Sequence, residues 1–275
     1  MTDTASPLTD ALHAGGVALS FPDERPACAV VSLERPAVRN AQTPATWAAL
    51  ARIGDLLAEP GYEGVRAVLV RGEGPSFSAG LDRRLFGAEG FEGQPGLPSL
   101  AALDPDTADA RIAEYQSGFA WLRESRFVTV AAVAGHALGA GFQLALACDL
   151  RVVADDVSFA MLETGLGIVP DLGGTLPLVQ AVGRARAVEI CLSGRRVGAQ
   201  EALALGLAQE VVPRADLDAA AGALVDRVLA GPPSATRETL ALLDAAADGP
   251  DPADQLAAER AAQLRRVRSL VAGTG

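Results

Sequence analysis

The stretch GHALGAGFQLALACD, residues 135–149, decides how the rest of the chain is interpreted. A run rich in Val and Ala, Val128–Val133, precedes it, and the residues after the turn are typical of a helix. Between the two lie three small residues, Gly139, Ala140 and Gly141. Such a turn leaves backbone N–H groups without intrahelical partners at the start of the helix, and small residues let another group come close to them. An uncharged amide, Gln143, follows just inside the helix.

A second turn of the same kind lies earlier in the chain. The segment GPSFSAGLD, residues 74–82, follows a strand-like run at Val65–Arg71 and contains Ala79 and Gly80. Two such turns that converge would form an oxyanion hole, a pair of N–H donors aimed at a developing negative charge. Either turn taken alone favours an ordinary tight turn.

Two carboxylates stand on a third segment, MLETGLGIVPDLGG, residues 161–174. Glu163 and Asp171 lie there among apolar residues and glycines. Carboxylates in apolar surroundings tend to have raised pKa values and to act as acids or bases. The alternative is that both residues cap helices or pair with arginines.

Composition and charge exclude several classes of function. The chain has 275 residues, of which 49 % are hydrophobic and 21 % charged, as expected of a soluble globular protein. Its net charge of −11 argues against a nucleic-acid partner, although it leaves room for a local basic pocket. Cys28, Cys148 and Cys191 lie far apart, and the chain has only two histidines, so no metal site is predicted. No signal peptide and no apolar run of roughly 20 residues is found, so we expect a cytoplasmic protein with no membrane partner.

The order of elements predicts an α/β fold. Strand-like runs occur at residues 17–21, 29–33, 65–71, 128–133 and 150–154, and helical segments at 43–58, 108–124 and 142–148. Residues 87–107 are rich in Gly and Pro and are interpreted as a surface loop beside a site. From Ala199 onward the sequence predicts helices over residues 199–213, 215–229, 234–246 and 252–272.

Taken in order, these motifs resemble the crotonase, or enoyl-CoA hydratase/isomerase, superfamily over about residues 15–215. The resemblance rests on VSLERPAVRNAQT (31–43), FSAGLD (77–82), the central block from the Val128 strand through Gly174, and the segment that ends at VVP (211–213). It implies a spiral of ββα units in residues 1–198 that holds the acyl-CoA site. It further implies a C-terminal helical region, residues 199–275, for assembly and site covering, in a homotrimer or a dimer of trimers.

The resemblance also implies the chemistry. Members bind acyl-CoA thioesters and stabilise the thioester enolate with two backbone N–H groups, which by position are those of Leu81 and Ala140. Glu163 matches a catalytic glutamate. Coenzyme A is part of the substrate, and no further cofactor or metal is implied. The expected substrate-binding residues are Ser78, Ala79, Gly80, Asp82, Gly139, Gly141 and Gln143.

One position departs from the hydratases of the superfamily, which have a second glutamate where this chain has Gln143. An amide cannot accept a proton at neutral pH, and loss of one member of an acid–base pair costs about two to four orders of magnitude in rate. Isomerases that shift a double bond need only the glutamate at Glu163, and dienoyl-CoA isomerases add an aspartate where Asp171 stands. The sequence therefore favours an enoyl-CoA or dienoyl-CoA isomerase of fatty-acid oxidation.

Other functions stay open at this point. One is an enoyl-CoA hydratase that works with Glu163 alone, and another is a catalytically silent acyl-CoA-binding protein. Aryl-CoA dehalogenases also carry an aspartate at the Asp171 position, as a nucleophile, but have tryptophan where this chain has Glu163. Decarboxylases and hydrolases share the oxyanion hole as well. Arg83 and Arg84 are candidates for CoA phosphates or for solvated surface residues, and His136, Trp47 and Trp121 are interpreted as packing residues.

Overall fold

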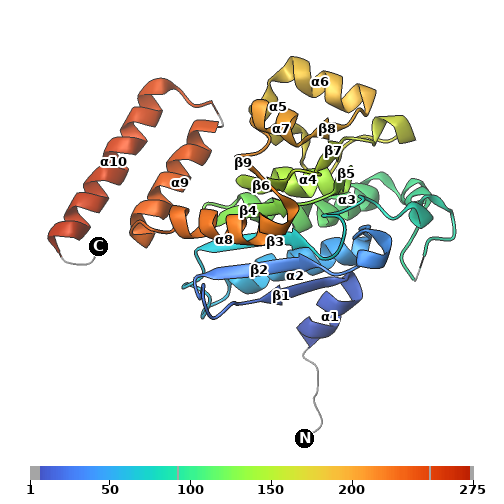
Figure 1. Ribbon diagram of the computed structural model, residues 1–275, viewed down its shortest axis with the longest axis horizontal. Helices are drawn as coiled ribbons and strands as arrows, with labels where there is room; N and C mark the ends of the chain where they lie inside the picture. The colour runs from blue at the N-terminus through green and yellow to red at the C-terminus, as the bar shows by residue number, and fades with distance from the viewer. Residues whose placement is uncertain (1–6, 92, 248, 273–275) are drawn as a thin grey trace, which may run out of the picture.

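The computed structural model describes residues 7–91, 93–247 and 249–272. Within them the chain builds a six-stranded sheet in the order β1–β2–β3–β4–β6–β9 and a three-stranded sheet in the order β5–β7–β8 (Figure 1). The strands are β1 (Val17–Ser20), β2 (Cys28–Leu33), β3 (Ala67–Gly72), β4 (Val128–Val133), β5 (His136–Leu138), β6 (Leu150–Ala154), β7 (Ser158–Ala160), β8 (Val197–Gly198) and β9 (Glu210–Val212). Apart from the antiparallel pairs β1–β2 and β7–β8, neighbouring strands run parallel.

Helices cover both faces of the large sheet, which is why its central strands are almost continuously apolar; every residue of β4 is buried. The helices are α1 (Pro7–Gly15), α2 (Pro44–Ala58), α3 (Pro105–Ala120), α4 (Ala140–Ala147), α5 (Thr175–Val182), α6 (Arg184–Ser193), α7 (Ala199–Ala204), α8 (Leu217–Val228), α9 (Pro233–Ala247) and α10 (Pro252–Val271). Helix α8 packs on one face through Leu217, Ala221 and Val225. Helices α2 and α4 share the larger core on the other face.

Helix α2 shows how local sequence sets the start of an element. Thr43 is its N-cap, and the side chain of Thr43 accepts a hydrogen bond from the N–H of Thr46 while the Thr46 side chain accepts one from the N–H of Thr43. This is a reciprocal capping box, and Pro44 occupies the first helical position, where its missing N–H costs nothing. The cap fixes the point at which α2 begins, directly after residues 35–42, a segment that borders the site.

Helix α4 is short and entirely buried, with apolar residues on all sides and Gln143 as its single polar side chain. A helix that is apolar all round belongs inside the core. Its first residue, Ala140, lies at the edge of a cavity, so the helix axis points into that cavity from within the protein.

The structure confirms the α/β class, the predicted strands and most of the predicted helices, within a few residues at their ends. The prediction of helix over residues 199–213 is wrong in its second half. Residues 210–212 form β9, which pairs in parallel with β6 and extends the large sheet. Residues 87–107 hold a 3₁₀ helix at Leu97–Ala102 and the first turn of α3 instead of an irregular loop throughout.

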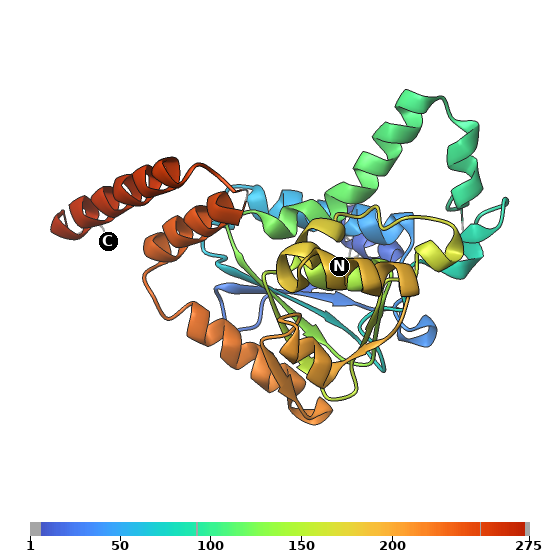
Figure 2. The ribbon, with the colours of Figure 1, turned by 90° about the horizontal axis from the view of Figure 1, so that it is seen from above.

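Helices α9 and α10 form a hairpin that extends away from the sheets, as both views show (Figures 1 and 2). Helix α10 packs against α9, and Leu256, Leu264 and Leu270 on α10 are more than half exposed. The Ser125 hydroxyl donates to Asp244 at 2.5 Å and so ties α9 to the body. The division of the chain at residue 198 stays a prediction. Beyond that residue, β9 and α8 still belong to the large sheet and its core. Among the described residues, no helix has the length and apolarity to cross a membrane.

Candidate active site

A cavity of about 1170 Å³ opens between the two glycine-rich turns, the segment 162–172 and the 83–100 region. It is as large as the ligand cavities that enclose whole small molecules. The wall includes all four residues predicted to be catalytic, Leu81, Ala140, Glu163 and Asp171. It also includes five of the predicted substrate-binding residues, Ala79, Gly80, Asp82, Gly139 and Gln143. The sequence motifs therefore meet at one place.

The first turn directs the N–H of Leu81 into this cavity. The N–H of Gln42 donates to the carbonyl of Gly80 at 2.7 Å, and the N–H of Asp82 donates to the carbonyl of Gln42 at 2.8 Å. In a planar trans peptide the N–H points opposite to the C=O. Because Gln42 holds the Gly80 carbonyl, the Leu81 N–H points away from Gln42. It donates to no other backbone group in the described part of the chain.

The second turn presents the N–H of Ala140. Gly139 adopts φ +50°, and its carbonyl accepts from the N–H of Gln143 at 2.9 Å to start α4. The Ala140 N–H, in the same peptide plane, therefore points out of the helix N-terminus, where no intrahelical acceptor exists. The aligned peptide dipoles of α4 favour negative charge at this point.

The two turns pack against each other without room for side chains. A Cβ on Gly80, which has φ +83°, would lie 2.4 Å from the carbonyl oxygen of Leu138 and 3.5 Å from the nitrogen of Ala140. A Cβ on Gly141 would lie 2.5 Å from the carbonyl oxygen of Ser78. Glycine is needed at both positions because only its absent side chain allows this approach. The two turns are thereby in backbone contact beside the Leu81 and Ala140 donors, and both residues line the cavity.

Gln143 joins the two segments that carry the carboxylates. Its Nε2 donates to Glu163 Oε1 at 2.7 Å, and its Oε1 accepts from the N–H groups of Leu172 at 2.9 Å and Gly174 at 3.2 Å. Two N–H donors require the amide oxygen on their side, so the nitrogen must face Glu163. The amide is thus oriented by its surroundings, and both lone pairs of its oxygen are occupied.

Glu163 is a buried carboxylate of the site, with 6 % of its surface exposed, and unlike the buried Asp82 it has no arginine partner among the described residues. Burial raises its pKa, the charge of Asp171 raises it further, and hydrogen bonds from backbone N–H groups and Gln143 oppose the shift. Its Oε1 is held by Gln143, whereas Oε2 has no hydrogen-bond partner among the described residues. A buried carboxylate oxygen without a partner at the wall of a cavity is available to accept a proton from a bound molecule.

Asp171 faces the same cavity from the following loop. Burial raises the pKa of its carboxyl too. The loop is held from both sides, because Gln116 Nε2 of α3 donates to the Asp171 carbonyl at 2.7 Å and the next residue donates to Gln143. The alternative that Glu163 and Asp171 merely pair with arginines does not hold, because no ion pair involves either of them in the described ranges.

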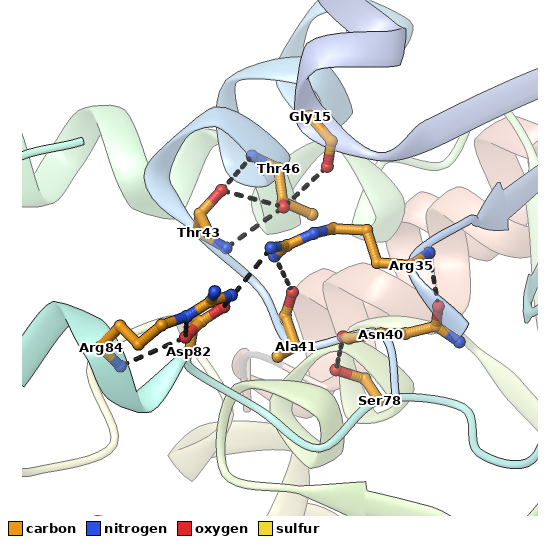
Figure 3. Close-up of polar contacts among 9 residues, drawn as sticks. All are labelled: Gly15, Arg35, Asn40, Ala41, Thr43, Thr46, Ser78, Asp82 and Arg84. Carbon is orange, nitrogen blue, oxygen red and sulfur yellow. Dashed lines mark hydrogen bonds and ion pairs between the residues drawn. The ribbon is translucent and has the colours of Figure 1, made fainter. Parts of the chain in front are cut away.

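Two predicted substrate-binding residues, Asp82 and Ser78, have polar side chains that are already bound to partners within the protein. Asp82 pairs with Arg84 at 2.6 Å and Arg35 at 3.4 Å (Figure 3), and the Arg84 hydrogen bonds hold its pKa low. Ser78 is fully buried, and its hydroxyl donates to the carbonyl of Asn40 at 2.8 Å. Ser78 and Gly141 lie behind the cavity wall. In the structure Ser78 and Gly141 support the two turns and are not among the residues that line the cavity, and a substrate contact for either stays a prediction.

Sequence reasoning missed several residues of the cavity. Trp47 and His136, interpreted as packing residues, both line it, as do Arg39 and Arg196. Burial and the charges of Arg196 and Arg39 lower the pKa of His136, so this rim of the cavity is basic although the protein is acidic overall. Arg83 and Arg84 line the cavity as well, and the Arg84 guanidinium lies 3.4 Å above the Phe91 ring. Arg83 and Arg84 are already candidates from the sequence, whereas no sequence spacing marks Arg39 and Arg196, which come from segments far apart in the chain.

Comparison with known proteins gives a consistent result. The family model "Enoyl-CoA hydratase/isomerase" matches residues 23–269. "Probable enoyl-CoA hydratase EchA17" of Mycobacterium tuberculosis is 40 % identical over 211 residues, which cover 77 % of this chain and 74 % of that one. A Thermobifida fusca YX protein described as an enoyl-CoA hydratase, solved with acetoacetyl-CoA, is 46 % identical with a TM-score of 0.88, covering 96 % of this chain and all of that one. A structure of an enoyl-CoA hydratase from Polaromonas sp. JS666 is 28 % identical with a TM-score of 0.79, covering 94 % and 93 %.

The matched region includes both glycine-rich turns, Glu163 and Asp171, and runs through the sheet into the C-terminal helices. The chain is an enzyme of the enoyl-CoA hydratase/isomerase family, with the crotonase fold.

Proposed function

We propose that this enzyme binds an acyl-CoA thioester in the 1170 Å³ cavity and shifts a carbon–carbon double bond of the acyl group. The Thermobifida fusca relatives were solved with acetoacetyl-CoA and with CoA, which supports an acyl-CoA ligand. The basic rim formed by Arg39, Arg83, Arg84 and Arg196 suits the phosphates of CoA. The apolar wall around Trp47, Leu97 and Leu100 suits an acyl chain.

In the proposed reaction the thioester oxygen accepts hydrogen bonds from the N–H groups of Leu81 and Ala140. Glu163 Oε2 removes a proton from C2 of a 3-enoyl thioester, and the electron pair moves into the carbonyl to form a dienolate. The proton returns to C4 as the double bond forms between C2 and C3, so no oxidant, reductant or further cofactor is needed. Each oxyanion donor lowers the barrier by about 3 kcal/mol in enzymes where one has been removed.

The observation that carries this proposal is that the side-chain amide of Gln143 already has hydrogen-bond partners within the protein on both its oxygen and its nitrogen. A hydratase of this kind needs a second group to hand a proton to or from the attacking water. Gln143 cannot ionise, its oxygen is saturated by Leu172 and Gly174, and its nitrogen holds Glu163. The site therefore has one well-placed base in contact with the second turn, which suffices for a proton shuttle from C2 to C4.

Asp171 extends the proposal to dienoyl-CoA substrates. Its carboxyl faces the cavity with a raised pKa, as does Glu163. Two such groups can take a proton at one end of a conjugated system and deliver one at the other, in keeping with two carboxylates set apart by their environments.

An enoyl-CoA hydratase that uses Glu163 alone is the second candidate, and the names of the relatives favour it. Pure 3-enoyl-CoA and pure 2-enoyl-CoA, offered separately, distinguish the two. We expect the 3-enoyl ester to be converted to the conjugated 2-enoyl ester, whose absorbance then persists. Rapid disappearance of 2-enoyl absorbance through hydration would overturn the isomerase proposal. Binding of both esters without turnover would indicate a catalytically silent acyl-CoA-binding protein.

We also propose that the chain assembles as a homotrimer or a dimer of trimers. The hairpin of α9 and α10 supports this, because Leu243, Leu256, Leu264 and Leu270 are exposed there in the single chain. Light scattering during size-exclusion chromatography measures the mass, and a mass of one chain of 28.1 kDa would contradict the assembly. The cytoplasmic location stays a prediction from the sequence.

A further inference from the structure

Gln42 is a buried glutamine that the proposed chemistry does not use. It is fully buried, and it lies between Ala41 and Thr43 on the segment that leads into α2. An amide without access to water must find all its hydrogen bonds within the protein, and a buried polar side chain that does so tends to fix one local arrangement. The partners of Gln42 lie in the acyl cavity wall on one side and in the first oxyanion turn on the other.

The hydrogen bonds through Gln42 have only one possible direction. Trp47 Nε1 donates to Gln42 Oε1 at 2.8 Å, and an indole N–H can only donate. The amide nitrogen of Gln42 therefore faces the other way and donates to Ser78 Oγ at 3.0 Å. The Ser78 hydroxyl donates a hydrogen bond to the carbonyl of Asn40 at 2.8 Å (Figure 3) and accepts a second one from the N–H of Gly80 at 3.2 Å.

The backbone of Gln42 holds the same turn from the outside. Its N–H donates to the Gly80 carbonyl at 2.7 Å and its carbonyl accepts from the Asp82 N–H at 2.8 Å. Gly80 is thus held at its carbonyl by the Gln42 backbone and at its N–H by Ser78, which Gln42 in turn orients. Because the Leu81 N–H shares a peptide plane with the Gly80 carbonyl, these contacts set the direction of that N–H.

We propose that Gln42 is a positioning residue for the Leu81 oxyanion donor, acting through Ser78 and Gly80 and linking that donor to Trp47 in the acyl cavity wall. The inference rests on the proposed function, since it assigns a task to an oxyanion hole. Gln42 has no contact with the cavity, so it contributes to the direction of the donor and not to substrate binding. Displacing a group that contacts the reacting atoms by as little as 1 Å costs up to about a hundredfold in rate.

The test uses two variants. Gln42→Leu keeps the approximate size of the side chain and removes the hydrogen bonds of its amide to Trp47 and Ser78. Ser78→Ala is a smaller change that removes the hydroxyl between Gln42 and Gly80. Thr46→Val is the matched control. Thr46 is as buried as Gln42, and its hydroxyl donates to the Gly15 carbonyl at 2.8 Å, but it contacts neither the 78–82 turn nor the cavity (Figure 3). All three variants lose a buried hydrogen bond near α2, and Thr46→Val also removes half of the α2 capping box, but only the first two remove a link in the chain of hydrogen bonds to the donor.

Two readouts separate positioning from folding. The first is turnover of 3-enoyl-CoA, for which Gln42→Leu and Ser78→Ala are each expected to lower kcat about tenfold with KM within about twofold, the pattern of an interaction made in the transition state. The second is the absorption maximum of bound 2,4-hexadienoyl-CoA, measured in the Glu163→Gln background so that the ligand persists. Donors aimed at the thioester oxygen polarise the conjugated system and move its absorption to longer wavelength.

We expect this shift with Glu163→Gln alone and with Thr46→Val added, and a smaller shift when Gln42→Leu or Ser78→Ala is added. The double variant of Gln42 and Ser78 should lose no more than either single one, because the two act in series. An undiminished shift and kcat in Gln42→Leu would overturn the inference and leave the proposed function intact. An equal loss in Thr46→Val would overturn it too. No shift in Glu163→Gln alone would show that the proposed oxyanion hole itself is absent.

Discussion

Replacing Gln143 by glutamate changes the site at the contact that most distinguishes it. The amide nitrogen lies 2.7 Å from Glu163 Oε1. Two ionised carboxylate oxygens at that distance would repel each other by about 6 kcal/mol at an effective dielectric constant of about 20. At 1.36 kcal/mol per pKa unit, that corresponds to a separation of about four units between the two ionisations. The pair would therefore keep one proton at neutral pH.

The surroundings decide where that proton lies. The N–H groups of Leu172 and Gly174 would still donate to one oxygen of the introduced carboxylate, and its other oxygen would carry the proton toward Glu163. The site would then hold an acid beside a base, as water addition requires. We expect Gln143→Glu to accelerate hydration of 2-enoyl-CoA by about a hundredfold or more and to slow the double-bond shift, since the base shares its proton.

The assay follows the loss of conjugated absorbance from 2-enoyl-CoA and its appearance from 3-enoyl-CoA in the same preparation. Gln143→Leu serves as the control, because it removes the amide and supplies no acid, and it should gain no hydration. A folded Gln143→Glu enzyme that binds 2-enoyl-CoA as the wild type does, and hydrates it no faster, would refute the argument that Gln143 sets the reaction type.

Four further predictions concern the carboxylates and the first turn. Since the pKa of Glu163 is raised by burial, kcat/KM for the double-bond shift should rise with pH through a midpoint above the usual 4.5 of a glutamate; a midpoint at or below that value would contradict it. The stability contributed by Glu163 is present at low pH and lost as pH rises through its folded-state pKa, so Glu163→Gln should raise the urea midpoint at pH 8 and leave it unchanged below about pH 4. Asp171→Asn should lower dienoyl-CoA isomerisation by about a hundredfold and affect 3-enoyl-CoA within a few-fold, whereas equal losses on both would remove the special role of Asp171. Gly80→Ala should destabilise the fold by about 1–3 kcal/mol more than Gly61→Ala, which has φ +107° in open space, and equal urea midpoints would refute the close packing of the two turns.

Much of the fold could be predicted because the central strands are long apolar runs between glycines and charges. Val128–Val133 matches β4 residue for residue. The strands that were not predicted are short ones that form only because they pair with a neighbouring strand. Residues 210–212 carry two valines after an alanine-rich helical stretch, and only the parallel partner β6 makes them a strand. Strands β5, β7 and β8, of three, three and two residues, lie below the length at which alternation can be recognised.

The part of the site that could be predicted from the sequence is the pair of turns that supply backbone N–H donors. The small residues at 139–141 and 79–80 indicated two turns with unpaired backbone N–H groups, and the resemblance to the crotonase superfamily assigned the donors to Ala140 and Leu81. The contribution of Gln42 could not be foreseen, since it depends on partners in two segments far apart in the sequence: Trp47 of α2, and Ser78, Gly80 and Asp82 of the first turn. In the sequence, the only sign of this role is a glutamine between Ala41 and Thr43, directly before α2. Ser78 is the reverse case: the sequence predicts that it binds substrate, whereas in the structure its hydroxyl is buried and donates to the Asn40 carbonyl.

The direct test of the account is the rate at which Glu163→Gln converts 3-enoyl-CoA to 2-enoyl-CoA, measured beside its affinity for a saturated acyl-CoA. Gln at position 163 keeps an acceptor for Gln143 Nε2 and removes the base. We expect kcat to fall by about three orders of magnitude, with an unchanged Kd for the saturated ester. Isomerisation at the wild-type rate by a folded Glu163→Gln enzyme would contradict it.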